Sequence, residues 1–151
     1  MQINARDWKF EVSEDPTAGV PVWAQVGGLE TFSLSNSENE ESADTTTFES
    51  AGHSESQAMQ RGASIKLEGK IKRAATTPFA QDAGQVAADN LAELIGEDSL
   101  GGIRFRYVTD TEWTVWTAWV SKGDNGGGNN DKTTWSATFT RSGAATTATV
   151  V

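Results

Sequence analysis

The 151-residue chain contains no cysteine, and this absence removes several classes of chemistry. Disulfide bonds, thiolate nucleophiles and cysteine-ligated metals are all excluded without thiols. Proline is scarce, and no stretch approaches the roughly 18 apolar residues that a membrane-spanning helix needs. Residues 1–10 contain no apolar segment of the kind that a secretory signal requires. We therefore expect no membrane association and no secretory targeting.

Basic residues are also in short supply, because 12 Lys and Arg stand against 21 Asp and Glu, and the formal net charge is −9. A protein that wraps nucleic acid needs clustered positive charge against the phosphates. The composition argues against that mode of binding, but it is compatible with a surface that DNA slides past. The length is that of one domain, and we expect residues 1–151 to form a single domain with its own core.

Residues typical of catalysis are few, and His53 is the single histidine. The serines beside it do not meet the geometry of a serine triad, because neighbours in a polar loop cannot form the nucleophile–base–orienter arrangement. The pair Glu40-Glu41 lies in the same loop, whereas glycosidase chemistry needs two carboxyls fixed across a cleft. The Asp/Asn/Gly-rich segment 124–131 lacks the spacing of a calcium-binding EF-hand. We expect no enzyme activity, no cofactor and no metal site.

Apolar and polar residues alternate in several segments of the chain. This alternation is typical of strands with one buried face. The clearest case is segment 64–72, where Ile65, Leu67 and Ile71 are expected to point inward and the charged residues outward. The tail, residues 143–151, is predicted to be an edge strand or a flexible arm. Further strands are predicted at residues 7–12, 20–26, 29–35, 102–108, 112–120 and 132–141.

Segment 112–120 is apolar on both sides, with Trp113, Val115 and Trp119 on one face and Trp116 on the other. This pattern predicts a central strand that is covered on both faces. Four tryptophans, including Trp135 on the next strand, also fit a sugar-stacking platform. Core packing is the interpretation we favour, because tryptophan contributes a large apolar surface to sheet cores.

One helix is predicted at about residues 82–95, where the apolar period changes to three and four. Asp82 followed by Gln85 has the form of a capping box, and Gly96 is placed to end the helix. The polar side is expected to carry Asp89, Asn90 and Glu93. The apolar positions expected to face the sheet are Val86, Ala87, Leu91, Leu94 and Ile95.

Between two predicted strands lies a long acidic segment, residues 36–62, which is rich in Ser, Thr and Glu. Loops longer than about 12–15 residues are uncommon in compact domains and are usually functional or disordered. This one carries Phe48 and Met59 although it cannot bury them by itself. We expect it to be a long loop that is ordered by another molecule, most simply a second copy of the chain.

The fold expected from these segments is mainly β, an antiparallel sandwich or barrel-like domain with one flanking α-helix and a long inter-strand loop. Two stretches make the chain resemble a known family: DTTTFESAGH at residues 44–53 and SIKLEG at residues 64–69. With the early VGGLETFSL at residues 26–34 and the later helix and Trp-bearing hairpin, the chain resembles the major tail tube proteins of long-tailed, non-contractile (siphovirus-type) bacteriophages.

The resemblance implies a structural virion protein without enzyme activity, which assembles in the host cytoplasm into hexameric rings. The rings stack into a tail tube whose acidic lumen lets double-stranded DNA pass during ejection without specific binding. Implied partners are further copies of the chain, a tape measure protein, a tail terminator and distal tail or baseplate proteins. The loop residues expected to make contacts between subunits are Glu38, Glu40, Glu41, Asp44, Thr47 and Phe48.

Within this set Phe48 is the expected apolar anchor. Two alternatives stay open. One is a carbohydrate- or cell-surface-binding β-sandwich, which the Trp-rich strands suggest. The other is a related tail-completion or distal tail protein, which would differ from a tube protein in its copy number.

Overall fold

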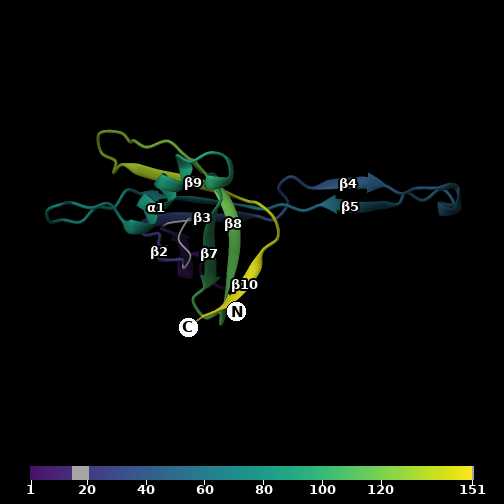
Figure 1. Cartoon of the computed structure of the whole chain (residues 1–151), viewed down its shortest axis with the longest axis horizontal. Helices are drawn as coiled ribbons and strands as arrows, with labels where there is room; N and C mark the ends of the chain where they lie inside the picture. The colour runs from purple at the N-terminus through teal and green to yellow at the C-terminus, as the bar shows by residue number, and fades with distance from the viewer. Residues whose placement is uncertain (15–20, 151) are drawn as a thin grey trace.

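The computed structural model describes residues 1–14 and 21–150. Its body is built on an eight-stranded antiparallel sheet in the order β2-β1-β7-β8-β9-β6-β3, with β10 paired to β8 (Figure 1). The predicted class, a mainly antiparallel β domain with one helix, is confirmed. The strands are β1 Trp8–Ser13, β2 Trp23–Gln25, β3 Leu29–Ser35, β6 Ser64–Lys70, β7 Gly101–Tyr107, β8 Glu112–Lys122, β9 Thr134–Arg141 and β10 Thr146–Thr149.

The predicted strands match these closely, apart from a few boundaries. The predicted strand at residues 20–26 shrinks to β2, and its first residue, Val20, lies outside the described residues. Of the two expectations for the tail, the edge strand is confirmed, because β10 pairs with β8. Val151 also lies outside the described residues.

The sheet folds over on itself at β8, which is the longest strand. Its first half pairs with β7 and β10, whereas its last residues pair with β9. As a result β7 and β8 run across the direction of β3 and β9 (Figure 1). The two ends of the sheet meet where Trp8 stacks on Phe32, with ring centroids 5.4 Å apart and planes 13° apart. The arrangement is a barrel-like sandwich.

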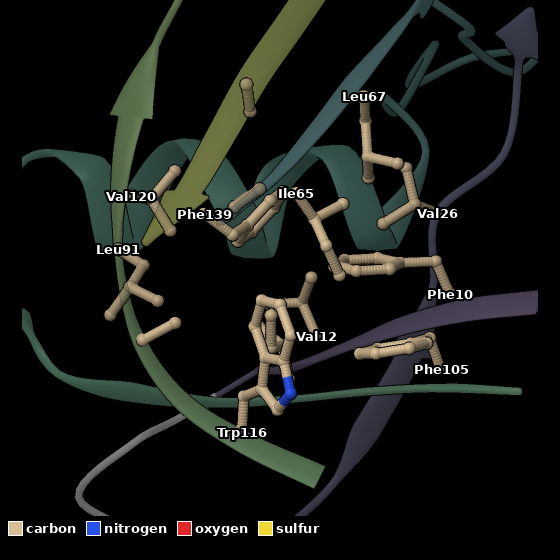
Figure 2. Packing of buried hydrophobic residues seen from close by; sticks show 14 of the residues in the cluster. Phe10, Val12, Val26, Ile65, Leu67, Leu91, Phe105, Trp116, Val120 and Phe139 are labelled. Atoms are coloured by element: carbon tan, nitrogen blue, oxygen red, sulfur yellow. The ribbon is translucent and has the colours of Figure 1, made fainter. Parts of the chain in front are cut away.

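The core fills the space that this folding encloses. Phe10, Phe105, Trp116 and Phe139 point into the same interior, with Leu91 reaching in from the helix (Figure 2). Phe10 and Phe139 lie 4.9 Å apart between ring centroids, and Trp116 meets Phe105 edge-on at 5.2 Å. Tilted and edge-on pairs of this kind add to the stabilisation from burial. The alternation predicted for β6 is confirmed, because Ile65 and Leu67 are fully buried.

The helix, α1 (Ala83–Ala92), is shorter than the predicted 82–95. Asp82 is its N-cap and accepts a hydrogen bond from the Gln85 amide at 3.3 Å, as predicted. The expected reciprocal bond from the Gln85 side chain is not made, because this side chain turns into the core instead. There its Nε2 donates to the carbonyls of Gly27 and Lys70 at 3.0 and 2.8 Å.

The end of the helix also differs from the prediction. The chain tightens at Leu94, whose amide bonds to the Leu91 carbonyl, and becomes extended at Ile95. Gly96 therefore opens a short 3-10 turn (Gly96–Ser99) rather than ending the helix. Since Leu94 and Ile95 lie beyond the last helical turn, the helical period no longer places them on the core. Ala87 and Leu91 are buried as predicted, whereas Val86, Leu94 and Ile95 are exposed.

The polar side of the helix was also predicted incorrectly at one position. Asp89 faces the sheet, because its Oδ1 accepts a hydrogen bond from Trp135 Nε1 at 3.0 Å. The second carboxylate oxygen lies 3.7 Å from Lys122 Nζ. The carboxylate thus accepts the hydrogen bond that the N–H of the buried Trp135 indole requires.

Candidate assembly interface: the projecting arm

Residues 36–62, here called the arm, form a β-hairpin that extends far from the body (Figure 1). Its strands are β4 (Glu41–Asp44) and β5 (Ser56–Gln60), paired antiparallel. The expected long segment between two strands of the sheet thus contains a pair of strands of its own, which the sequence analysis did not predict. The sequence did not predict these strands because neither has a buried face. A strand without a buried face shows no alternation of apolar and polar residues.

The arm is exposed along its length. All residues of β5 and three of the four in β4 are exposed. A two-stranded hairpin on its own is marginally stable in water, since it buries little apolar surface. The edges of its strands also carry free backbone groups that favour pairing with other chains. An arm of this kind is suited to being covered by a partner.

The arm tip, residues 44–55, is nonetheless folded through its own hydrogen bonds. The Thr45 amide donates to the Glu55 carbonyl at 3.0 Å, and the Glu55 amide donates to Thr46 Oγ1 at 2.9 Å. A 3-10 turn, Phe48–Ser50, forms the apex, where Thr47 N donates to Ser50 Oγ at 3.1 Å. The tip is thus held in shape before any partner arrives, which lowers the entropy lost on binding.

At the apex, Phe48 projects fully into solvent, with a relative exposure of 103%. Met59 on β5 is also well exposed. Large aromatic side chains that protrude from a rigid turn are the usual anchors of protein interfaces. The tip therefore presents one exposed aromatic side chain among Thr and carboxylate groups.

Two carboxylates of the tip are held in their charged form. A hydrogen bond from the Thr46 side chain, followed by one from the Thr46 amide, lowers the pKa of Asp44. The Glu49 amide, and then the Thr47 side chain, lowers the pKa of the Glu49 carboxyl. Hydrogen bonds to a carboxylate favour its ionised form. Both groups therefore contribute to the tip structure while they are charged.

The root of the arm is fastened separately. Glu40 forms an ion pair with Arg61 at 3.0 Å, and Gln60 Nε2 donates to the Asn39 carbonyl at 2.6 Å. Gly62 lies directly against the Glu38 carbonyl, so that a side chain at this position would collide with the backbone. These contacts fix the direction in which the arm leaves the sheet.

The structure divides the six residues predicted as subunit contacts into two groups. Asp44, Thr47 and Phe48 come together at or beside the tip, whereas Glu38, Glu40 and Glu41 lie at the root. Sequence analysis did not single out Glu49 and Glu55, which complete the acidic tip. The sequence does contain a sign of a folded tip, namely the Thr and Ser residues around Phe48. Their side chains form the capping and turn hydrogen bonds there.

The tryptophans do not form a sugar-stacking platform. Trp113, Trp116 and Trp135 are at most 6% exposed. Core packing is confirmed for Trp116 and Trp135, whereas Trp113 is buried outside the core cluster. The prediction that β8 is covered on both faces was only partly right, since Trp119 is 44% exposed. Two arginine side chains lie over the ring of Trp113.

The guanidinium groups of Arg104 and Arg106 lie 4.3 and 4.9 Å from the Trp113 ring centroid. Arg104 also lies 4.6 Å from the Trp23 ring and is paired with Glu11 at 2.5 Å. Long basic side chains cover apolar surface while their charged ends stay near water, and their cations are attracted to indole faces. The side chains of these arginines therefore pack on tryptophan rings and stabilise this face of the sheet.

The features considered for catalysis or metal binding do not gather into a site. His53 lies exposed in the arm tip, where its amide donates to the Ser50 carbonyl. In segment 124–131 the Asp131 carboxylate accepts a hydrogen bond from Gly128 at 3.1 Å. Within residues 1–14 and 21–150, no three His, Asp or Glu side chains lie together as metal ligands. Over the same residues no helix is long and apolar enough to span a membrane.

Comparison with known proteins yields solved structures only: no family model and no curated protein matches the chain. A chain in the tail of an empty gene transfer agent particle, obtained with helical refinement and C6 symmetry, matches with a TM-score of 0.70 and 20% identity over 96% of this chain and 98% of that one. A chain in the virion of a native gene transfer agent particle matches with a TM-score of 0.68 and 19% identity, over 97% and 99%.

A third match lies in the six-fold symmetrised baseplate of the anti-feeding prophage, with a TM-score of 0.57 and 10% identity, over 99% and 97% of the two chains. This chain has the fold of proteins from tail and baseplate assemblies. The matched chains are covered almost from end to end, so the likeness extends over the whole fold. At these identities it concerns the fold and not the function.

Proposed function

We propose that the protein is a structural subunit of a phage-type tail tube, with no enzyme activity. The observation that carries the proposal is the arm: a preformed, fully exposed hairpin with an aromatic apex, on a body that shares its fold with tail proteins. An arm that cannot bury its own anchor is suited to contacts between subunits. The whole chain, as one domain, is the repeating unit of this tube.

The tube we propose consists of stacked hexameric rings. The support for six copies is that the matched tail and baseplate assemblies have C6 or six-fold symmetry. Joining the sheet edges of neighbouring subunits would remove edges that are otherwise prone to aggregation. Head-to-tail contacts that close give rings, and repeated contacts between rings give a filament.

We further propose that the lumen is a conduit for DNA ejection in a siphovirus-type tail. The net charge of −9 supports this role, because a negatively charged wall repels phosphates and leaves DNA free to move. Assembly would take place in the host cytoplasm and end in the virion. Partners would be a tape measure protein, a tail terminator and distal tail or baseplate proteins.

The decisive test of self-assembly replaces residues 42–59 of the arm by Asn-Gly, which forms a tight hairpin turn. The variant keeps the arm root, including Glu40 and Arg61, and leaves the core unchanged. We expect it to unfold at the same urea concentration as the complete chain but to form no rings or tubes in electron micrographs. Tubes formed equally well by the armless variant would overturn the proposed role of the arm.

A second candidate is a distal tail or tail-completion protein, which the match to a baseplate chain favours. It differs in stoichiometry. A tube subunit is present in many copies per particle, whereas a completion protein forms one ring or a few. Quantifying the protein relative to the other components of purified particles distinguishes the two.

A further inference from the structure

A second exposed aromatic residue lies at the other end of the molecule from the arm. The loop between β6 and α1, residues 71–82, projects on the side opposite to β4 and β5 (Figure 1). Its ends are pinned by the Ala74 amide, which donates to the Ala80 carbonyl at 2.8 Å, and by a bridge between Arg73 and Gln81. At its turn Phe79 is 53% exposed.

Phe79 is held in this position by the backbone. Its amide donates to the Thr76 carbonyl at 2.8 Å, and its φ of 57° lies in the left-handed region that non-glycine residues seldom adopt. Such strain persists where the surrounding structure requires it, and it is concentrated at functional positions. The loop thus presents its aromatic side chain from a defined turn, as the arm presents Phe48.

Beside this loop runs a shallow groove along the first turn of α1. Its lining combines apolar residues of the loop and the helix with polar ones, Glu14 included: Glu14, Ala80, Gln81, Ala83, Val86, Ala87 and Asn90. Val86 belongs to the apolar stripe of the helix by sequence, yet it is 37% exposed. The groove and the loop together offer apolar surface that the body itself leaves uncovered.

The two ends of the molecule carry opposite charge. The arm tip contains Asp44, Glu49 and Glu55 and no Lys or Arg. The loop, residues 71–82, contains Lys72 and Arg73 in a chain of net charge −9. Its one acidic residue, Asp82, is the N-cap of α1, and its carboxylate accepts hydrogen bonds from the Gly27 and Gln85 amides. Opposite charges on two surfaces steer association and fix its orientation.

Lys72 and Arg73 are exposed and adjacent in the chain. In the described part of the chain, no ion pair engages either of them. The other clustered cations are already used within the fold. Lys66 and Lys70 pair with carboxylates on β6 and β3, and three arginines cover tryptophan rings.

We propose that the arm tip of one copy docks on the 71–82 loop and the adjoining groove of α1 in the next copy. Phe48 would lie beside Phe79 and Val86, and the acidic tip would face Lys72 and Arg73. Because donor and acceptor lie at opposite ends, the contact is head-to-tail and repeats from copy to copy. This inference rests on the self-assembly proposed above, and it names the surface that receives the arm.

Chemical cross-linking tests the pairing of the two ends. Because the chain has no native cysteine, only the introduced cysteines can react. The test variant carries His53→Cys in the tip and Thr76→Cys in the loop, both at exposed positions that leave Phe48, Phe79 and the charges intact. The control variant carries His53→Cys with Thr109→Cys, in the exposed turn between β7 and β8. Both are treated with a short bismaleimide, beside each single variant, and inspected by electron microscopy.

We expect a ladder of covalent oligomers from the 53/76 variant and none from the 53/109 variant or the single variants. Tubes or rings that give no 53/76 ladder would overturn the docking surface but leave the proposed function standing. A chain that forms no assemblies would overturn both, so the two failures are distinguishable.

Charge reversal provides an independent test. Arg73→Glu alone and Glu55→Lys alone are each expected to raise the protein concentration needed for assembly by roughly fivefold, the factor that corresponds to about 1 kcal/mol. Combined, they should restore assembly close to the original concentration. The control is Arg73→Glu combined with Glu97→Lys, an exposed charge on the turn after α1, which should restore nothing. Equal rescue by both combinations would contradict the pairing.

Discussion

Gln85 shows how a single polar residue ties the helix to the sheet. It is fully buried, and its side chain bonds the backbones of two different sheet segments. Its Oε1 also accepts from the Lys72 amide at 3.2 Å, where β6 gives way to the following loop. Buried polar groups are tolerated when they are hydrogen-bonded in this way.

Replacing this residue tests its role. Gln85→Leu keeps the volume but leaves two buried carbonyls and one amide without partners, which we expect to lower the free energy of unfolding by roughly 2–5 kcal/mol. Urea denaturation measures this loss. Gln57→Leu, at an exposed position of β5, serves as the control and should cost less than about 1 kcal/mol.

Phe48 is the residue whose exposure has no explanation within one copy of the chain. Phe48→Ser should leave the free energy of unfolding within about 0.5 kcal/mol of the original, because the ring contacts solvent. It should nevertheless prevent assembly, as sedimentation and electron microscopy would show. The comparison is Phe139→Ala in the core, which should cost about 3–5 kcal/mol. A Phe48→Ser protein that assembles normally would contradict the anchor role.

At the scale of elements, apolar alternation identified strands of the body such as β6 and β9, because each of these has one face against the core. It failed for β4 and β5, whose two faces are both polar and exposed. The boundaries of α1 could be read only at its start, where Asp82 is a local signal. The position at which α1 ends depends on how the chain turns toward β7. The spacing of apolar residues along a helix carries no information about that turn.

The sequence also did not predict which residues contact the aromatic side chains. Alternation placed Trp113 on the opposite face of β8 from Trp116, but only the three-dimensional structure shows that Arg104 and Arg106 cover its ring. For the candidate site, sequence analysis selected the segment that forms the arm and named Phe48, which the structure places exposed at the apex. It could not separate tip from root, because this separation follows from the hairpin register.

The arm tip should be sensitive to acid. The pKa values of Asp44 and Glu49 are lowered in the fold, so their stabilising hydrogen bonds are fully present above the ordinary values of 3.8 and 4.5. As the pH falls below these values and through the lowered pKa values, protonation removes this contribution. We expect the tip to loosen before the body.

Amide hydrogen exchange, corrected for intrinsic rates, measures this order of events. Protection of Thr46 and Ser50 amides should fall below about pH 4.5, whereas amides of β6 and β9 stay protected. The control carries Asp44→Asn and Glu49→Gln, which should remove the acid-dependent step at the tip. Tip and body losing protection together would contradict the account.

At the scale of the whole molecule, the two ends of the long axis differ in charge. An acidic tip with Phe48 occupies one end, and a basic loop with Phe79 lies at the other (Figure 1). The rigid, barrel-like body between them keeps the two ends at a fixed separation. Such a subunit can repeat in one direction, which is what stacked rings require.

The most direct measurement of this account is electron microscopy of the purified full-length protein over a series of concentrations, together with size-exclusion chromatography. The account predicts hollow tubes or stacked six-fold rings that appear as the concentration rises. Single copies at every concentration, with no rings in the micrographs, would contradict it.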